Sequence, residues 1–276
     1  MHVVHFTNGA DQFARYGILE GDVIREIEGS PFGEVRRTGA SYGACNVTML
    51  TPCAPGKIVA GGANYHGHLR EMNLAHPSVP VFFLKAPSAI IGHNDSIEYP
   101  PESQRLEYEG ELGVIVKRKM RRVEPDEVSA CILGYTCVND VTARDINMWG
   151  GNFLHLCHAK SFDTFCPVGP WITTDIDPNK LGVKLTVNGE TRQNSNTEDM
   201  IFSIAKMISY FSQVMTLNPG DLILTGSPEG TGRLEVGDIV ELTIENIGTL
   251  SNKVIASRIN HGSVLDKRQE KHLEGR

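Results

Sequence analysis

Residues 106–116, LEYEGELGVIV, carry the pattern on which the fold and the site depend. Glu107, Glu109 and Glu111 stand at alternate positions, and side chains two apart on a β-strand share a face. Neighbouring like charges destabilise a sheet. Two interpretations are open. The face is solvated and balanced by the basic residues that follow it, or Glu109 and Glu111 bind a divalent cation, with Glu107 left beside the site or in solvent.

A third oxygen ligand is available at Asp140, where the apolar segment CILGYTCVND (131–140) ends. Ligands made only of oxygen select hard ions such as Mg²⁺, Mn²⁺ or Ca²⁺. The alternative role for Asp140 is the N-cap of a helix over 141–149. In that helix Arg144 and Asn147 would share a face and suit a clamp for a carboxylate substrate, although a lone arginine is commonly a surface ion pair.

The stretch NYHGHLREM (64–72) predicts a short helix over about 65–74. In it His68 and Glu71 are three residues apart and can touch. A histidine with a carboxylate partner is the arrangement of a general base that activates water. Flanking glycines and prolines make the segment a candidate lid. The alternative is an ordinary amphipathic turn with incidental histidines.

Two further stretches are weaker signals. HAKSFDTFCPVGPW (158–171) holds Lys160, whose simplest interpretation is a surface lysine. ILTGSPEGTG (223–232) is rich in glycine but lacks the Gly-Lys-Ser/Thr ending of a phosphate-binding loop. Its backbone N–H groups, that of Gly226 among them, and Thr225 are candidates for holding a carboxylate.

The pattern of the whole chain predicts a mostly β fold with a few helices, of the α+β class. We expect a small N-terminal β-domain over 1–50, a main domain over 51–258 and a frayed polar tail over 259–276. Asn188-Gly189 is a strong hairpin signal. One helix is expected from near Pro125. Another is expected over 198–215, capped by a Ser195–Glu198 capping box or by Thr197. Strands are expected at 58–62, 81–85, 106–117, 134–139, 183–188, 221–225 and 239–245.

Composition limits the class of partner. The 276 residues carry a net charge of −7, which argues against nucleic acid or a membrane surface. No apolar run approaches the roughly 18 residues that span a bilayer, and the first residues lack a signal-peptide pattern. The six cysteines form no C-x-x-C pair. We therefore expect reduced thiols and a cytoplasmic protein.

Taken in order, eight motifs resemble the fumarylacetoacetate hydrolase family. They are NYHGHLREM, FFLKAPSAIIG, LEYEGELGVIV, NDVTARD, AKSFDTFCPVGPW, VNGETRQ, MIFSIAKMISY and GDLILTGSPEGTG. The resemblance implies a mixed β-roll or sandwich, a homodimer and a divalent metal, commonly Mg²⁺ or Mn²⁺. Departures are small: Glu107 stands where Asp is frequent, Asn147 where many relatives have Gln, and the loop reads TGSPEG rather than TGTPxG.

The resemblance also implies roles for individual residues. It places the metal on Glu109, Glu111 and Asp140, the base on His68 and Glu71, and a catalytic lysine at Lys160. Arg144, Asn147, Thr225 and Gly226 are the expected substrate contacts.

The function to expect is a metal-dependent hydrolase that cleaves a C–C bond in a β-diketo acid such as an acylpyruvate or a fumarylacetoacetate-like compound. The same site would suit an oxaloacetate decarboxylase or a 2-hydroxyhepta-2,4-diene-1,7-dioate isomerase acting on a small dicarboxylate. His68 and Glu71 favour hydrolysis or decarboxylation. The alternative outside enzymes is a metal-stabilised binding module.

Overall fold

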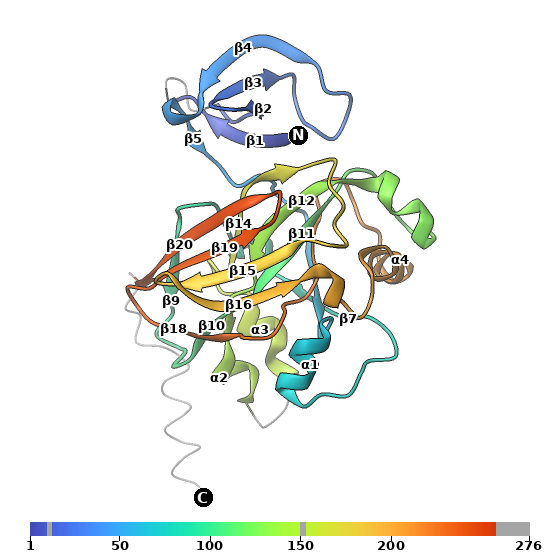
Figure 1. Cartoon of the computed structure of the whole chain (residues 1–276), viewed down its shortest axis with the longest axis vertical. Coiled ribbons are helices and arrows are strands. Elements are labelled where there is room, and N and C mark those ends of the chain that lie inside the picture. Colours follow the sequence, from blue (N-terminus) through green and yellow to red (C-terminus); the bar gives the residue numbers. More distant parts are fainter. Residues whose placement is uncertain (10–12, 150–152, 258–276) are drawn as a thin grey trace, which may run out of the picture.

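A computed structural model describes residues 1–9, 13–149 and 153–257 of the chain. Strands dominate, and the sheets are mixed, as the sequence predicts for this α+β class (Figure 1). The tail predicted over 259–276 lies outside the described residues. The α-helices of the described part are α1 (His66–Met72), α2 (Arg144–Asn147), α3 (Leu156–Lys160) and α4 (Ile204–Val214).

One large sheet runs through the molecule, and two smaller sheets pack beside it. The large sheet has the order β4 (Arg37–Gly43), β3 (Val23–Ile27), β2 (Arg15–Glu20), β1 (His2–Thr7), β14 (Cys166–Thr173), β12 (Ile132–Asn139), β11 (Gly110–Val116), β17 (Leu222–Leu224), β6 (Ile58–Gly62) and β7 (Val81–Lys85), with β5 (Thr48–Met49) on β1 and β8 (Ile90–Ile91) on β14. The second has the order β16 (Glu190–Asn196), β15 (Gly182–Val187), β19 (Ile239–Ile244), β20 (Gly248–Ala256) and β9 (Ser96–Tyr99). The third is β13 (Thr142–Ala143), β10 (Leu106–Tyr108) and β18 (Gly232–Leu234).

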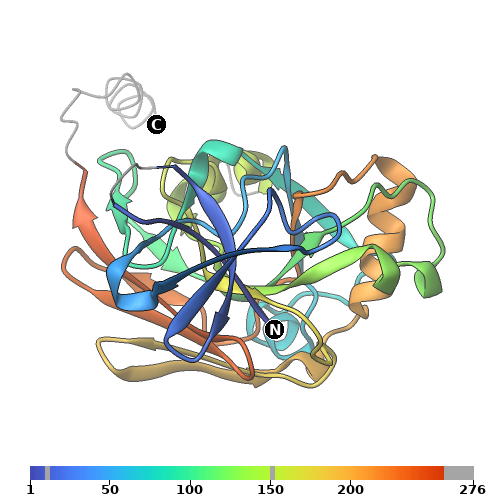
Figure 2. The ribbon, with the colours of Figure 1, turned by 90° about the horizontal axis from the view of Figure 1, so that it is seen from above.

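The N-terminal strands, β1 to β5, form a small appendage at the end of the large sheet. They lie at one end of the molecule, over the main body when seen from above (Figures 1 and 2). Val4, Phe6 and Ile24 make a separate small core there. The appendage joins the body through β1, where Val3 pairs with Ile172 of β14.

The body is organised around β11, whose seven residues are all buried. β11 pairs with β12 on one side and β17 on the other. At its first residue, Gly110, an added Cβ would lie 2.8 Å from Leu242 and 3.1 Å from Leu185, both of the second sheet. Glycine at this position therefore lets the two sheets approach closely.

The hairpin predicted at Asn188-Gly189 is present between β15 and β16. Asn188 has φ 53° and Gly189 φ 80°, the left-handed conformations that a tight two-residue turn requires. The strands predicted at 58–62 and 81–85 are confirmed as β6 and β7.

The helix predicted from near Pro125 is wrong. The chain forms two 3₁₀ turns, Pro125–Glu127 and Ser129–Cys131, and then enters β12. Pro125 does occupy a first-turn position, the signal behind the prediction, and the side chains of Glu124 and Glu127 cap this turn reciprocally. Pairing with β11 then draws the following residues into a strand, so tertiary context overrides the local pattern.

The helix predicted over 198–215 begins later and has another cap. Ser203 caps α4, its Oγ accepting from the N–H of Lys206, while Asn196 caps a separate 3₁₀ turn. Asn64 explains the delay. Its backbone carbonyl accepts from Ile201 N and its side-chain oxygen from Phe202 N, so these two N–H groups are bonded outside the helix.

No helix in the described part of the chain is long and apolar enough to cross a membrane.

Candidate metal centre and active site

The predicted strand over 106–117 is interrupted at Glu109. β10 ends at Tyr108 and belongs to the third sheet, while β11 starts at Gly110 in the large sheet. The backbone of Glu109 remains hydrogen bonded across the break: its N–H donates to Asn139 Oδ1 (3.0 Å), and its carbonyl accepts from Asp140 N (2.8 Å). The break therefore fixes Glu109 directly beside the end of β12, where Asp140 lies.

Three carboxylates meet at this point. Glu109, Glu111 and Asp140 are all buried, and each offers an oxygen within 4.8 Å of the others. Glu111 Oε2 accepts from the N–H of Gly226 at 2.6 Å. Asp140 does not cap a helix, because β13 follows it and α2 starts only at Arg144. The alternative role for Asp140, the N-cap of a helix over 141–149, is thus wrong.

Glu107 takes no part in this group. It is 3% exposed, so the solvated alternative is wrong for it, and its two oxygens accept from Arg105 Nε (2.7 Å) and Arg144 Nε (2.6 Å). Arg144 Nη2 also reaches Glu109 Oε1 at 2.5 Å. Arg144 therefore ties the outer glutamate to the inner one.

Two buried lysines balance the carboxylates. Lys160, at the end of α3, is not the surface lysine that its local sequence suggests: it is 3% exposed and donates to Glu109 Oε2 (2.7 Å) and Asp140 Oδ2 (2.5 Å). Lys85, at the end of β7, donates to Asp140 Oδ1 (2.5 Å) and to the carbonyl of Val141. Lys85 is not among the site residues predicted from the sequence. The available signal was a lysine that ends the apolar strand VFFLK.

The charges perturb one another in opposite directions. Burial alone raises the pKa of Glu109, but the Lys160 ammonium and the Arg144 guanidinium outweigh it and lower that pKa to about 2. Among the described residues no cation forms an ion pair with Glu111, and burial and the Asp140 carboxylate outweigh the more distant effect of Lys160, so the pKa of Glu111 is raised well above the usual range. Burial lowers the pKa of Lys160, but Asp140 and Glu109 prevail and raise it, which keeps the ammonium charged.

This donor set fits a divalent metal ion. Three buried carboxylates on rigid elements offer oxygen atoms only, which is the chemistry of a hard cation. The raised pKa of Glu111 marks a position where a positive charge is missing among the described residues. A cation at this point would ionise Glu111 and offset the repulsion between the three acids.

Two of the three carboxylates, those of Glu109 and Glu111, line a cavity of about 300 Å³. Its two cations, Arg144 and Lys160, both lie at the carboxylate end, where they donate to Glu109. Asn147 is 1% exposed and lines the cavity, and among the described residues neither its oxygen nor its nitrogen has a hydrogen-bond partner. The rest of the wall is largely apolar: Met72, Leu74, Val81, Phe83 and Leu156.

His68 reaches the same cavity from α1. Its Nδ1 lies 3.7 Å from Glu71 Oε2, which is contact distance but not a hydrogen bond, and this buried nitrogen has no hydrogen-bond partner in the described part of the chain. The Glu71 carboxylate instead accepts from the N–H of Gly230 (3.1 and 3.2 Å to its two oxygens). The predicted pair is thus brought together, with Glu71 engaged on the glycine-rich loop.

Thr225 and Gly226 lie behind the carboxylates and do not line the cavity. The Thr225 hydroxyl donates to the carbonyl of Leu112 (3.0 Å), and the side chain is fully buried. Gly226 N–H is taken by Glu111. In this conformation both residues hold β11 rather than face the cavity.

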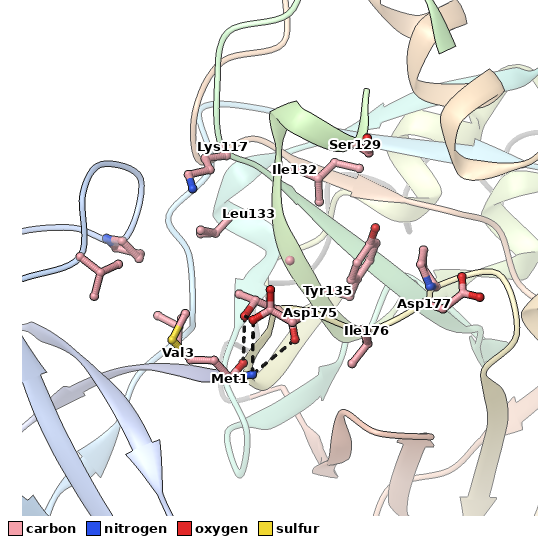
Figure 3. A pocket seen from close by; sticks show the side chains of 15 residues that line it. Met1, Val3, Lys117, Ser129, Ile132, Leu133, Tyr135, Asp175, Ile176 and Asp177 are labelled. Atoms are coloured by element: carbon pink, nitrogen blue, oxygen red, sulfur yellow. Dashed lines mark hydrogen bonds and ion pairs between the residues drawn. The ribbon is translucent and has the colours of Figure 1, made fainter. Parts of the chain in front are cut away.

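A larger cavity, of about 510 Å³, lies between the N-terminal strands and β12 (Figure 3). Met1, Val3, Tyr135 and Asp175 are among its lining residues, and the N-terminal ammonium lies 3.9 Å from the Asp175 carboxylate. The carboxylate group and its lysines do not line this cavity, so size alone does not indicate the site.

Comparison with known proteins agrees with this geometry. The family model for the C-terminal part of fumarylacetoacetate (FAA) hydrolase matches residues 57–255. The chain belongs to the fumarylacetoacetate hydrolase family. Residues 1–52 match a second model, the N-terminal part of Rv2993c-like proteins.

Three relatives indicate the range of this family. The solved structure of 5-carboxymethyl-2-hydroxymuconate delta-isomerase from Mycobacterium smegmatis is 40% identical with a TM-score of 0.86, covering 93% of this chain and 100% of that one. Mitochondrial oxaloacetate tautomerase FAHD2A of Bos taurus is 42% identical over 76% of this chain and 70% of its own length. Maleylpyruvate hydrolase from Sphingobium sp. SYK-6, solved with manganese(II) and pyruvate, is 30% identical with a TM-score of 0.76, covering 94% of this chain and 100% of that one. The relatives named are enzymes, and they differ in reaction class.

Proposed function

We propose that this protein is a metal-dependent hydrolase that cleaves the C–C bond of a β-diketo acid, with acylpyruvates as the substrate class. The observation that carries the proposal is the group of Glu109, Glu111 and Asp140, in which the charged Lys160 bridges Glu109 and Asp140. Glu109, Glu111 and Lys160 line a cavity that His68 also lines.

Glu109, Glu111 and Asp140 would hold the ion, Mg²⁺ or Mn²⁺, and such an ion polarises the 2-oxo group of a bound acid and stabilises the negative charge of an enolate. The manganese and pyruvate in the Sphingobium relative support this assignment. Ca²⁺ satisfies the same oxygen donors and is the alternative ion.

His68 is the proposed general base. Its buried, unpartnered Nδ1 is 3.7 Å from Glu71, so a small rotation of Glu71 would supply the acceptor that orients the ring. His68 then takes a proton from water as the water oxygen bonds to the distal carbonyl carbon of the substrate. When the C–C bond breaks, the electron pair passes to the methylene carbon, and protonation of that carbon yields pyruvate and a carboxylic acid.

Lys160, Arg144 and Asn147 are the proposed substrate contacts. The Lys160 ammonium remains charged and would donate to the oxyanion that forms on the attacked carbon. Asn147 offers a donor and an acceptor, both unpartnered at the cavity wall, to the polar head of the substrate. Arg144 lies beside it on α2 and would add positive charge near the substrate carboxylate.

The apolar wall supports an apolar acyl tail. Beyond the carboxylate end, the described wall residues are mainly apolar: Met72, Leu74, Val81, Phe83 and Leu156. None of these side chains is a cation that could pair with a second carboxylate of the substrate. A charged tail buried there would lose its hydration without compensation. This favours acylpyruvates over dicarboxylates such as oxaloacetate.

A second candidate is proton transfer or decarboxylation at the same centre, on oxaloacetate or a hydroxydienedioate. The relatives named as an isomerase and a tautomerase, at 40% and 42% identity, favour it. These reactions need the same stabilised enolate but no attacking water.

A substrate panel separates the two. Protein loaded with Mn²⁺ is incubated with acetylpyruvate, a longer acylpyruvate, oxaloacetate and 2-hydroxyhepta-2,4-diene-1,7-dioate, with a chelator-treated sample as the control. The proposal expects release of pyruvate from both acylpyruvates, lost on chelation. Turnover of only the dicarboxylates would replace it with the second candidate. Metal binding without any turnover would favour a binding module.

A further inference from the structure

We infer that Gln193 is a positioning residue of the metal centre: its side chain locks the break in the Glu109–Glu111 strand to the loop over 226–230. This inference rests on the proposed function only in taking the three carboxylates as metal ligands. Gln193 belongs to the VNGETRQ motif, which the sequence analysis used for the family resemblance without giving it a role.

The oxygen of Gln193 holds the strand break. The side chain is fully buried, and its Oε1 accepts from the N–H of Gly110 at 2.9 Å. Gly110 is the single residue between Glu109 and Glu111. A backbone N–H can only donate, so this contact fixes which end of the amide is oxygen. The position of Gly110 therefore depends on Gln193.

The nitrogen of Gln193 holds the glycine-rich loop. Nε2 lies within donor distance of Ser227 Oγ (2.9 Å), the Pro228 carbonyl (3.0 Å) and the Glu229 carbonyl (3.3 Å). The two hydrogens of this amide are thus shared among acceptors on three consecutive residues of the loop. Ser227 also lines the cavity.

Both ends of that loop reach the proposed machinery. At one end Gly226 N–H donates to Glu111 Oε2 (2.6 Å), and at the other Gly230 N–H donates to Glu71. The Gln193 amide therefore connects a ligand strand, the donor that holds Glu111 and the carboxylate beside His68. Removing it takes hydrogen bonds away from both the loop and the residue next to the strand break.

A bulge in β16 explains how the side chain of Gln193 comes to point toward Gly110 and the loop over 226–230. The pairing of β15 with β16 shifts register between Leu185 and Thr186, which leaves Arg192 as an extra residue in β16. Such a bulge re-aims the neighbouring side chain. In β16, Gln193 is buried while the residues around it are exposed or partly exposed.

Close packing keeps the loop on β16. Gly230 has φ +86°, and a Cβ there would lie 2.3 Å from the carbonyl oxygen of Arg192. The loop thus touches the strand backbone next to Gln193, and the contact tolerates no side chain.

When a residue that positions a metal ligand without touching the metal is replaced, metal affinity or activity typically falls by about 10–100-fold.

The test compares Gln193→Met with Asn252→Leu. Methionine has a similar size and keeps no hydrogen bond. Asn252 is an equally buried amide, 2% exposed, in β20 of the same sheet, and it donates to the carbonyls of Gly92 and Asp95. Mn²⁺ affinity is measured by calorimetry and the unfolding midpoint by thermal denaturation, together with kcat and KM on the substrate found in the panel.

We expect both variants to lower the unfolding midpoint, and Gln193→Met alone to weaken Mn²⁺ binding by about 10–100-fold. Gln193→Asn keeps the amide but shortens the side chain, so its Mn²⁺ affinity should lie between those of wild type and Gln193→Met. It also replaces Gln193→Met in the test if the methionine variant does not fold. Mn²⁺ affinity within twofold of wild type in Gln193→Met or Gln193→Asn, or an equal loss in Asn252→Leu, would overturn the inference. A wild-type protein that binds Mn²⁺ but turns over no substrate would refute the proposed function and leave this inference standing.

Discussion

The ammonium of Lys85 lies 2.5 Å from Asp140 Oδ1, and both side chains are completely buried. One cation is thus committed to each oxygen of this acid, because Lys160 holds Oδ2. Asp140 would otherwise be a buried carboxylate facing two others. Lys85 is therefore part of what makes the group of acids tolerable before any metal binds.

Lys85→Met should destabilise the metal-free protein, since removing one partner of a buried ion pair costs about 3–5 kcal/mol. It also makes the carboxylate group more negative by one charge. Added Mn²⁺ replaces that charge, so the metal should raise the unfolding midpoint by more in the variant than in wild type. Thermal denaturation with and without Mn²⁺ measures both effects.

Lys57→Met is the matched control, because Lys57 pairs with the buried Asp221 on the β6–β17 side of the sheet and does not line the cavity. It should lose stability yet show the wild-type response to Mn²⁺. If the metal response of Lys85→Met equals that of Lys57→Met, Lys85 has no electrostatic role at the centre.

Glu111 should make the metal-free protein less stable as pH rises. Its pKa in the folded state is raised above the ordinary 4.5, so between these two values the folded state binds more protons than the unfolded state. Stability is then lost as pH increases from about 4.5 through the raised value. Unfolding midpoints of the chelator-treated protein between about pH 5 and about pH 8 measure the loss.

Glu111→Gln provides the comparison, because glutamine cannot ionise. Its midpoint should fall less over the same range, while its affinity for Mn²⁺ is lost. In wild type, Mn²⁺ binding should release a proton, detectable by calorimetry in two buffers of different ionisation enthalpy. Parallel pH curves for the two proteins would contradict the raised pKa.

Asn147 and Thr225, both expected as substrate contacts, should now behave differently. Asn147→Ala removes two unpartnered polar atoms from the cavity wall, so kcat/KM should fall about 10-fold or more, the value of one or two hydrogen bonds. Thr225→Val removes only the hydroxyl bonded to Leu112, which should cost about 1 kcal/mol of stability and leave KM unchanged. A raised KM in Thr225→Val would return that residue to the substrate site.

His68→Ala should abolish water-dependent cleavage and leave Mn²⁺ affinity intact, because the proposed metal ligands are Glu109, Glu111 and Asp140 and do not include His68. His66→Ala, on the same helix with its ring against His76, is the control and should stay active. If His68→Ala loses Mn²⁺ affinity and activity to the same extent, the assignment of His68 as the general base is wrong.

The sequence correctly predicted those features that depend only on residues close together in the chain. The alternation in LEYEGELGVIV picked out Glu109 and Glu111, and Asn188-Gly189 fixed a hairpin, because both depend on residues adjacent in sequence. The break at Glu109 was missed. It depends on Asn139 and Asp140, some thirty residues away, which satisfy its backbone.

The residues that surround the carboxylates follow the same rule. Lys85 and Gln193 sit in strands whose local sequence gives no partner for them; only the fold brings Asp140 to one and Gly110 to the other. The misplaced helices near 125 and 198 failed for a related reason. The segment after residue 131 pairs with β11 as a strand, and the backbone N–H groups of Ile201 and Phe202 are bonded to Asn64 instead of within a helix.

The measurement closest to the central claim is anomalous diffraction from crystals grown with Mn²⁺. A peak within about 2.5 Å of carboxylate oxygens from Glu109, Glu111 and Asp140 is the predicted result. Data from Glu109→Ala crystals under the same conditions should lack that peak. A fully occupied peak elsewhere, or none at the carboxylates in an active crystal form, would contradict the account.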